Sequence, residues 1–207
     1  MIRRFFERNN PNALEHYLSD KFGPAIGAVL LFFLEVLQVV LISCAIIIPI
    51  RYFLIQPFYV KGASMEPNFY DQEYLIIDEL SYRFREPMRG EIIVFRYPRD
   101  PSQFFIKRVI GLPGETIEIT NGNVIIYNEE NPNGVVLEED YLVESTNGKK
   151  KVTLGEQEYY LLGDNRDESL DSRSFGVVDE QGIIGRVWIR GFPLSRIDLF
   201  GLPLYNF

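Results

Sequence analysis

One long apolar run dominates the N-terminal part of the chain. Residues 26–50 read IGAVLLFFLEVLQVVLISCAIIIPI, with Glu35 as the one charged side chain, and Arg51 ends the run. As a helix, this run would span about 37 Å, which is enough to cross a hydrocarbon core of roughly 30 Å with some tilt. The pattern predicts a transmembrane anchor helix over residues 26–55, preceded by a short N-terminal segment, residues 1–25.

Two alternatives for this apolar run can be weighed from its length and its end. A helix buried in a soluble protein is usually shorter and less apolar. A cleaved signal peptide has a shorter apolar core with a small-x-small site after it, whereas Ser43-x-Ala45 lies inside the run. An uncleaved anchor fits better than either. Glu35 is costly in lipid, and pairing with Gln38, contact with a partner helix or protonation would each relieve that cost.

Basic residues precede the apolar run. Residues 1–25 carry Arg3, Arg4, Arg8 and Lys21. Because arginine and lysine are enriched in the cytoplasmic segments that flank a membrane span, we expect the N-terminus to stay in the cytoplasm. The rest of the chain would then lie outside the cytoplasm, in a single-pass protein of the cell membrane.

The remaining part of the chain, residues 56–207, has a different pattern. Short apolar or alternating runs recur, and turn signals such as Asn121-Gly122 separate them. The predicted strands cover residues 73–78, 91–97, 104–110, 115–119, 123–127, 158–162 and 185–189. Several short strands with this spacing favour antiparallel sheets or a barrel. The expected fold is therefore mainly β, with an antiparallel β-sheet or barrel-like domain after one N-terminal transmembrane helix.

The composition narrows the chemistry that this domain can perform. The chain has one cysteine, Cys44, and one histidine, His16, which precedes the apolar run. Zinc sites built from several cysteines and histidines are therefore excluded, and so is a Ser-His-Asp triad in the β-rich part. A nucleophile there would need lysine, aspartate or glutamate as its base. The net charge of −8 argues against nucleic acid as a partner, and no metal or other cofactor is expected.

Two residues of the β-rich part are candidates for nucleophilic chemistry. Ser64 follows Gly62 and Ala63, which are small enough to let a substrate backbone approach, although an isolated serine in a turn is usually structural. Lys107 lies in the apolar run FFIKRVI, where strand alternation places it on one face with Phe105. An amine surrounded by apolar neighbours has a lowered pKa and can act as a general base. The alternative is a lysine that reaches from the strand into water.

A third segment, GDNRDESLDSRSFG over residues 163–176, directly follows the apolar run EYYLL. Its charged side chains stand among serines and glycines, which indicates a hydrogen-bonded network, whereas the alternative is a charged surface loop. The DxDxDG spacing of a calcium-binding loop is absent, so an EF-hand is excluded.

Together, four segments resemble the type I signal peptidases, also called leader peptidases. The matching segments are GASMEP around Ser64, RGEIIVFRYP over residues 89–98, FIKRVIGLPGE over residues 105–115 and GDNRDESLDSR over residues 163–173. They occur in the order that the family has, after an anchor helix. The resemblance covers roughly residues 30 to 190.

This resemblance implies a role for each matching residue. Ser64 corresponds to the nucleophile, Lys107 to the general base, and Ser169 to a serine whose hydroxyl holds the lysine amine. The residues that correspond to structural supports of the site are Asp164, Arg166, Asp171 and Arg173. Gly62 stands where some members carry a serine that adds a hydroxyl to the oxyanion hole, so this second donor is missing from the side chains here.

The implied function is a membrane-bound serine endopeptidase that removes N-terminal signal peptides from exported preproteins through an acyl-enzyme. Its partners would be these preproteins and the lipid bilayer, and we expect a monomer. Two other functions can be considered. A self-cleaving repressor with a Ser-Lys pair would need a DNA-binding helix-turn-helix where the apolar run stands. A membrane-tethered binding domain without enzymatic activity would keep its function without the Ser64 hydroxyl.

Overall fold

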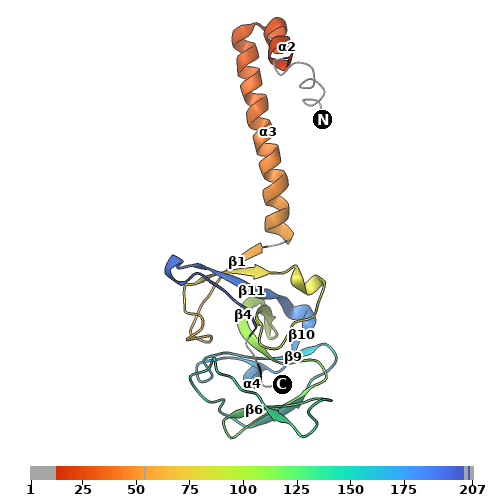
Figure 1. Cartoon of the computed structure of the whole chain (residues 1–207), viewed down its shortest axis with the longest axis vertical. Coiled ribbons are helices and arrows are strands. Elements are labelled where there is room, and N and C mark those ends of the chain that lie inside the picture. The colour runs from red at the N-terminus through yellow and green to blue at the C-terminus, as the bar shows by residue number, and fades with distance from the viewer. Residues whose placement is uncertain (1–12, 54, 203–204, 206–207) are drawn as a thin grey trace. The chain divides into compact units, whose positions relative to one another are not determined.

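The computed structural model describes residues 13–53, 55–202 and 205 (Figure 1). The chain divides into two compact units, with the boundary between Tyr52 and Phe53. The first unit holds two helices, and the second holds the strands.

The helical unit consists of α2 (Ala13–Phe22) and α3 (Pro24–Phe53). Gly23 separates them, with φ at +85° and its N–H donating to the carbonyl of Ser19 at 2.9 Å. Such a left-handed glycine is a common way to end a helix. Within α3, Pro24–Ile48 is a candidate membrane span, because an 18-residue window of it has a mean hydropathy of 2.7 and no residue buried inside the protein. The helix begins two residues before the predicted range, and Ile55, predicted as its last residue, lies in a strand.

The larger sheet of the second unit has the strand order β1-β2-β11-β3-β4-β9-β10, with β12 paired to β11. Its strands are β1 (Ile55–Tyr59), β2 (Tyr74–Asp78), β3 (Ile92–Tyr97), β4 (Asp100–Gly111), β9 (Glu158–Leu162), β10 (Val178–Asp179), β11 (Ile183–Phe192) and β12 (Asp198–Leu199). Each of these pairings is antiparallel.

A smaller antiparallel sheet has the order β7-β6-β5-β8. Its strands are β5 (Thr116–Thr120), β6 (Asn123–Tyr127), β7 (Val135–Val136) and β8 (Lys150–Thr153). Asn121 and Gly122 connect β5 to β6, and both have positive φ angles. This is the geometry that a two-residue hairpin loop requires, because it matches the twist of the flanking strands.

Short helical turns complete the unit. They are η1 (Ser81–Arg83), α4 (Ser172–Phe175), η2 (Glu180–Gly182) and η3 (Leu194–Arg196).

Strand β3 lies at the centre of the larger sheet and is buried on both faces. Ile92 and Val94 join one apolar cluster, whereas Ile93 and Phe95 join another. Since successive side chains of a strand point to opposite faces, the continuous apolar run of β3 follows from having a core on each side. The first of these clusters also contains Met65 and Phe69, which follow the candidate nucleophile in the sequence.

The predicted mainly antiparallel β fold after one apolar helix is confirmed. Each of the seven predicted strands corresponds to an observed one, namely β2, β3, β4, β5, β6, β9 and β11. The prediction missed β1, β7, β8, β10 and β12, none of which is longer than five residues.

Candidate active site

Ser64 lies in the loop that connects β1 to β2. Backbone hydrogen bonds between Val60 and Glu73 at 2.9 Å, and between Gln72 and Val60 at 3.0 Å, close this loop at its base. Met65 and Phe69 are 1% and 0% exposed, so the loop is anchored in the core on the C-terminal side of Ser64. The serine is thereby held in place by packed neighbours.

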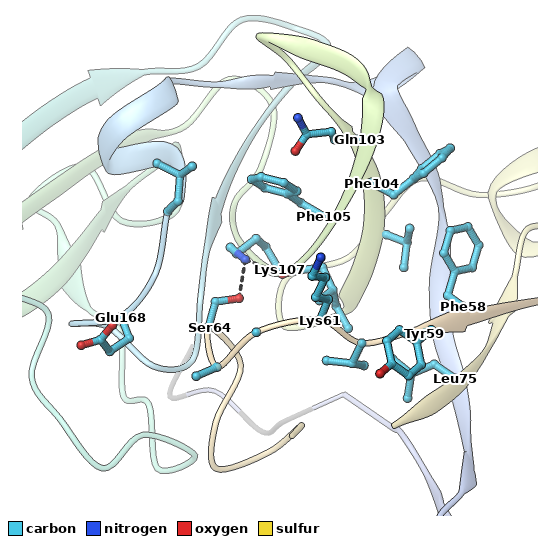
Figure 2. Close-up of a pocket in the computed structure, with 16 residues that line it drawn as sticks. Phe58, Tyr59, Lys61, Ser64, Leu75, Gln103, Phe104, Phe105, Lys107 and Glu168 are labelled. Carbon is cyan, nitrogen blue, oxygen red and sulfur yellow. Dashed lines mark hydrogen bonds between the residues drawn. The ribbon is translucent and has the colours of Figure 1, made fainter. Parts of the chain in front are cut away.

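Lys107 lies on β4, where it pairs with Ile93 of β3. Its Nζ is 2.7 Å from Ser64 Oγ and donates to the carbonyl of Ile106, also at 2.7 Å (Figure 2). The side chain is 3% exposed, and its amine lies 5.5 Å from the centre of the Phe105 ring. The alternative of a lysine that reaches into water is therefore excluded.

Burial lowers the pKa of Lys107 from 10.5 to about 8. The negative charges of Asp171 and Asp164 act in the opposite direction and limit the fall of this pKa. With a pKa near 8, about a tenth of the amine is neutral at pH 7, compared with less than about a thousandth for an unperturbed lysine. The site thus supplies a basic amine next to a hydroxyl.

Asp164 lies in the segment after β9. It contacts both the strand that carries Lys107 and the loop that carries Ser64. Its carboxylate accepts two hydrogen bonds from the Arg108 guanidinium, at 2.8 and 2.6 Å, and one from Asn68 Nδ2 at 2.9 Å. The next residue, Asn165, donates its N–H to the carbonyl of Ser64 at 3.1 Å. The segment therefore contacts the serine loop through backbone and side chains alike.

Arg166, Asp171 and Arg173 hold the same segment in shape. Arg166 donates to Glu139 at 2.9 and 2.5 Å and to the carbonyl of Gly163 at 3.0 Å. Asp171 accepts the N–H of Gly163 at 3.2 Å and two bonds from the Arg173 guanidinium at 2.9 and 2.8 Å. Arg166 and Asp171 are 1% and 0% exposed. The predicted hydrogen-bonded network is confirmed, and the surface-loop alternative is wrong for these residues.

Gly163 lies where the segment packs tightly against both Ser169 and Ser64. A Cβ atom at this position would lie 2.1 Å from Ser169 Oγ and 2.4 Å from the carbonyl oxygen of Ser64. Ser169 Oγ itself is buried and has no hydrogen-bond partner among the described residues. Its predicted role of holding the Lys107 amine stays a prediction.

A groove of about 470 Å³ opens over Ser64 and Lys107. Lys61, Gln103 and Glu168 contribute polar or charged side chains to it. The apolar part of its lining consists of Phe58, Tyr59, Val60, Leu75, Val94, Phe104, Phe105, Ile106 and Leu170. An extended chain with small or apolar side chains fits such a lining.

The sequence reasoning missed three partners of the site. Strand alternation puts Arg108 on the face opposite Lys107, but nothing in the sequence indicated that Asp164 would be its ion-pair partner. A charged residue in an apolar strand needs a buried partner, and that rule could have suggested the pair. Asn68 and Glu139 gave no comparable signal, because neither stands near Asp164 or Arg166 in the sequence.

Comparison with known proteins identifies a family for this chain. The family model described as "Signal peptidase, peptidase S26" matches residues 33–192. Signal peptidase I of Leptolyngbya laminosa is 38% identical over 82% of this chain and 85% of its own length. Signal peptidase I P of Bacillus subtilis subsp. natto is 31% identical over 78% of this chain and 90% of its own.

Among solved structures, a signal peptidase I from Enterococcus faecalis V583 is 36% identical in sequence. That similarity covers 50% of this chain and 97% of the other chain, with a TM-score of 0.44. The family model and the relatives confirm the resemblance drawn from the four sequence segments: this chain belongs to the signal peptidase family, peptidase S26, whose members cleave signal peptides.

Proposed function

We propose that the chain is a membrane-bound serine endopeptidase that cleaves N-terminal signal peptides with Ser64 as nucleophile and Lys107 as general base. The observation that carries the proposal is the distance of 2.7 Å between Lys107 Nζ and Ser64 Oγ, with the lysine 3% exposed. A buried amine with a pKa near 8 has the property that a general base for a serine requires.

In the first half of the reaction, neutral Lys107 has one lone pair and two N–H bonds. One N–H donates to the carbonyl of Ile106, and we propose that the lone pair accepts the Ser64 hydroxyl proton across the 2.7 Å between Nζ and Oγ. Ser64 Oγ attacks the scissile carbonyl while its proton passes to Nζ. The C–N bond then breaks, and the ammonium of Lys107 returns that proton to the leaving amine. The products are an ester on Ser64 and a free N-terminus.

In the second half, Lys107 takes a proton from a water molecule that attacks this ester. The bond between Ser64 Oγ and the acyl carbon breaks, and the proton returns from Nζ to Oγ. Ser169, next to Gly163, is the proposed holder of the amine during both halves. The segment with Asp164, Arg166, Asp171 and Arg173 keeps Gly163 against the carbonyl of Ser64.

The negative charge on the substrate oxygen needs hydrogen-bond donors. The backbone N–H of Ser64 is the first proposed donor. Gly62 offers no hydroxyl, and loss of one oxyanion donor typically costs about 10²- to 10³-fold in rate. A backbone N–H or a water molecule is therefore proposed as the second donor.

The proposed substrate is the end of a signal peptide, with small residues one and three positions before the cut. It binds in the groove as an extended strand, a mode in which backbone hydrogen bonds supply affinity and pockets supply specificity. Helix α3 anchors the enzyme with its N-terminus in the cytoplasm. Because enzyme and preprotein then share the membrane, the anchor raises their effective concentration.

The test is cleavage of a preprotein by the detergent-solubilised full-length protein. Sequencing the N-terminus of the product should locate a cut after a small residue. Ser64→Ala should release no product, and Ser102→Ala, at an exposed serine of β4, is the matched control. Equal product from the Ser64→Ala protein would refute the proposal.

A further inference from the structure

The two sides of the groove differ in chemical character. In Figure 2, Ser64 and Lys107 lie between Glu168 on one side and Phe58, Tyr59 and Leu75 on the other. The apolar side is built from β1, β2 and Phe104 of β4, whereas Glu168 comes from the segment that follows β9. Ser64 marks the point at which the substrate is cut, so each side receives a different part of the substrate.

The apolar side suits the residues before the cut, because the end of a signal peptide is small and apolar. The chain after the cut then leaves the groove past Glu168. An extended chain advances about 3.3 Å per residue. The first two residues of the mature protein would therefore lie within roughly 7 Å of the cleaved bond, on the side of Glu168.

Glu168 is placed to act on these residues through its charge. Its side chain is exposed, and no hydrogen bond or ion pair engages its carboxylate within the described part of the chain. Its backbone N–H donates to Asn165 Oδ1 at 3.1 Å, and Asn165 is itself bonded to the carbonyl of Ser64. The backbone at Glu168 is thus tied to the serine loop. The carboxylate remains available to a ligand.

We propose that Glu168 is a specificity-determining residue for the first two residues of the mature protein, favouring basic and disfavouring acidic side chains there. Leu170, which also lines the groove and is 47% exposed, adds an apolar contact. This inference rests on the proposed function. The other exposed charged residue among the described lining, Lys61, stands before Ser64 in the sequence, and Figure 2 draws it on the side away from Glu168.

The expected effect is moderate because the groove is open to water. Two charges at such separations in a medium of high dielectric constant change binding by about 3- to 10-fold. Salt should reduce the effect, since exposed charges are screened over roughly 8–10 Å at physiological ionic strength.

The test uses peptides that share one signal sequence and differ only after the cut, with Lys, Gln or Asp at the first or second position. The full-length protein in detergent should cleave the Lys peptides with a kcat/KM about 3- to 10-fold above that of the Asp peptides. Glu168→Gln should bring this ratio close to one, and Glu168→Lys should invert it. Asp167→Asn is the matched control. Asp167 is the adjacent residue and carries the same charge, but it does not line the groove and accepts a hydrogen bond from Asn147.

A ratio that stays the same in both Glu168 variants, or that changes equally in Asp167→Asn, overturns the inference. Those results would leave the proposed function intact, because the peptides would still be cut by a Ser64-dependent reaction. Loss of cleavage for all peptides with the wild-type protein would instead refute the proposed function, and the inference with it.

Discussion

At the scale of single residues, Lys107 as the proposed base would set the pH range in which the site works. Its pKa near 8 follows from burial, and the neutral form is the one that accepts a proton. We predict that kcat/KM rises with pH through about 8 and falls about tenfold per unit below that value, since this limb reports the base of the free enzyme. Lys107→Arg should be inactive, because guanidinium does not lose its proton in proteins. A flat profile between pH 6 and 9, measured with a synthetic peptide, would contradict the assignment of the base.

The same burial lowers the stability of the protein. Between pH 8 and 10.5 the unfolded chain binds a proton at Lys107 that the folded chain has lost, so stability rises with pH across that window. Below pH 8 the folded protein carries the full cost of the buried ammonium. We predict that Lys107→Met, although inactive, raises the free energy of unfolding at pH 7 by about 1–3 kcal/mol. Urea denaturation at pH 7 and pH 10.5 measures this gain, which should shrink at the higher pH. Lys149→Met, at an exposed position, is the control, and an equal gain there would argue against burial as the cause.

Gly163 has a role that depends on the absence of a side chain. A methyl group at this position would lie 2.1 Å from Ser169 Oγ and 2.4 Å from the Ser64 carbonyl, so the two segments would have to separate. Because displacement by about 1 Å can cost about 10²-fold in rate, we predict a loss of at least that size in kcat for Gly163→Ala. Gly201→Ala, where a Cβ meets no atom within 4 Å, should keep its activity. Full activity of Gly163→Ala would show that the contact does not position the serine.

Neighbouring residues made Ser64, Lys107 and the segment around Gly163 candidates, and the resemblance to the signal peptidases implied their roles. Small residues precede the serine, apolar residues surround the lysine, and charges cluster after an apolar strand. The partners Asn68 and Glu139 could not be found this way. They stand 96 and 27 residues from Asp164 and Arg166, and only the folded chain brings each pair together.

At the scale of elements, the hydrophobic pattern identified strands that bury a full face. Strands β5 and β6 alternate between buried and half-buried or exposed residues, and β3 and β9 are almost continuously buried. The missed strands lack such a signal. Strands β7, β10 and β12 have two residues each, and β8 reads KKVT without a buried side chain. Strand β1 follows the apolar helix so closely that its first residue was assigned to that helix.

Strands β4 and β9 position the two halves of one buried ion pair. Arg108 pairs with Leu162 across these strands, and Asp164 follows two residues later. The side chains are 5% and 0% exposed. Removing one member of a buried pair leaves an uncompensated charge, which costs about 3–5 kcal/mol. We therefore predict that Arg108→Met lowers the free energy of unfolding by that amount, as measured by urea denaturation.

The double variant Arg108→Met with Asp164→Leu separates the cost of an unpaired charge from the loss of packing. It should recover part of the stability that Arg108→Met loses, because no buried charge remains. A double variant that is less stable than Arg108→Met would show that the carboxylate contributes mainly through other contacts, such as the one with Asn68.

At the scale of the whole molecule, the two units differ in where their apolar side chains lie. The span Pro24–Ile48 contains an 18-residue window with a mean hydropathy of 2.7 and no residue buried in the protein. The strand unit instead packs three buried apolar clusters, although some of its apolar side chains, such as Phe84 and Leu194, are exposed. A helix of this composition is stable in lipid, where its backbone hydrogen bonds are satisfied internally. The charges that flank the span decide on which side of the membrane the strand unit lies. The basic residues before the span favour a cytoplasmic N-terminus.

This orientation can be tested with single cysteines, because Cys44 is the only native one. In a Cys44→Ser background, Asp20→Cys places a thiol at an exposed position of α2, and Glu129→Cys places one at an exposed position after β6. We predict that a membrane-impermeant maleimide added to intact cells labels Glu129→Cys, and that it labels Asp20→Cys only after the membrane is permeabilised. The reverse pattern would put the Ser64–Lys107 pair in the cytoplasm, where a peptidase could not meet signal peptides that have crossed the membrane. Labelling of both thiols in intact cells would mean that the helix does not span the bilayer.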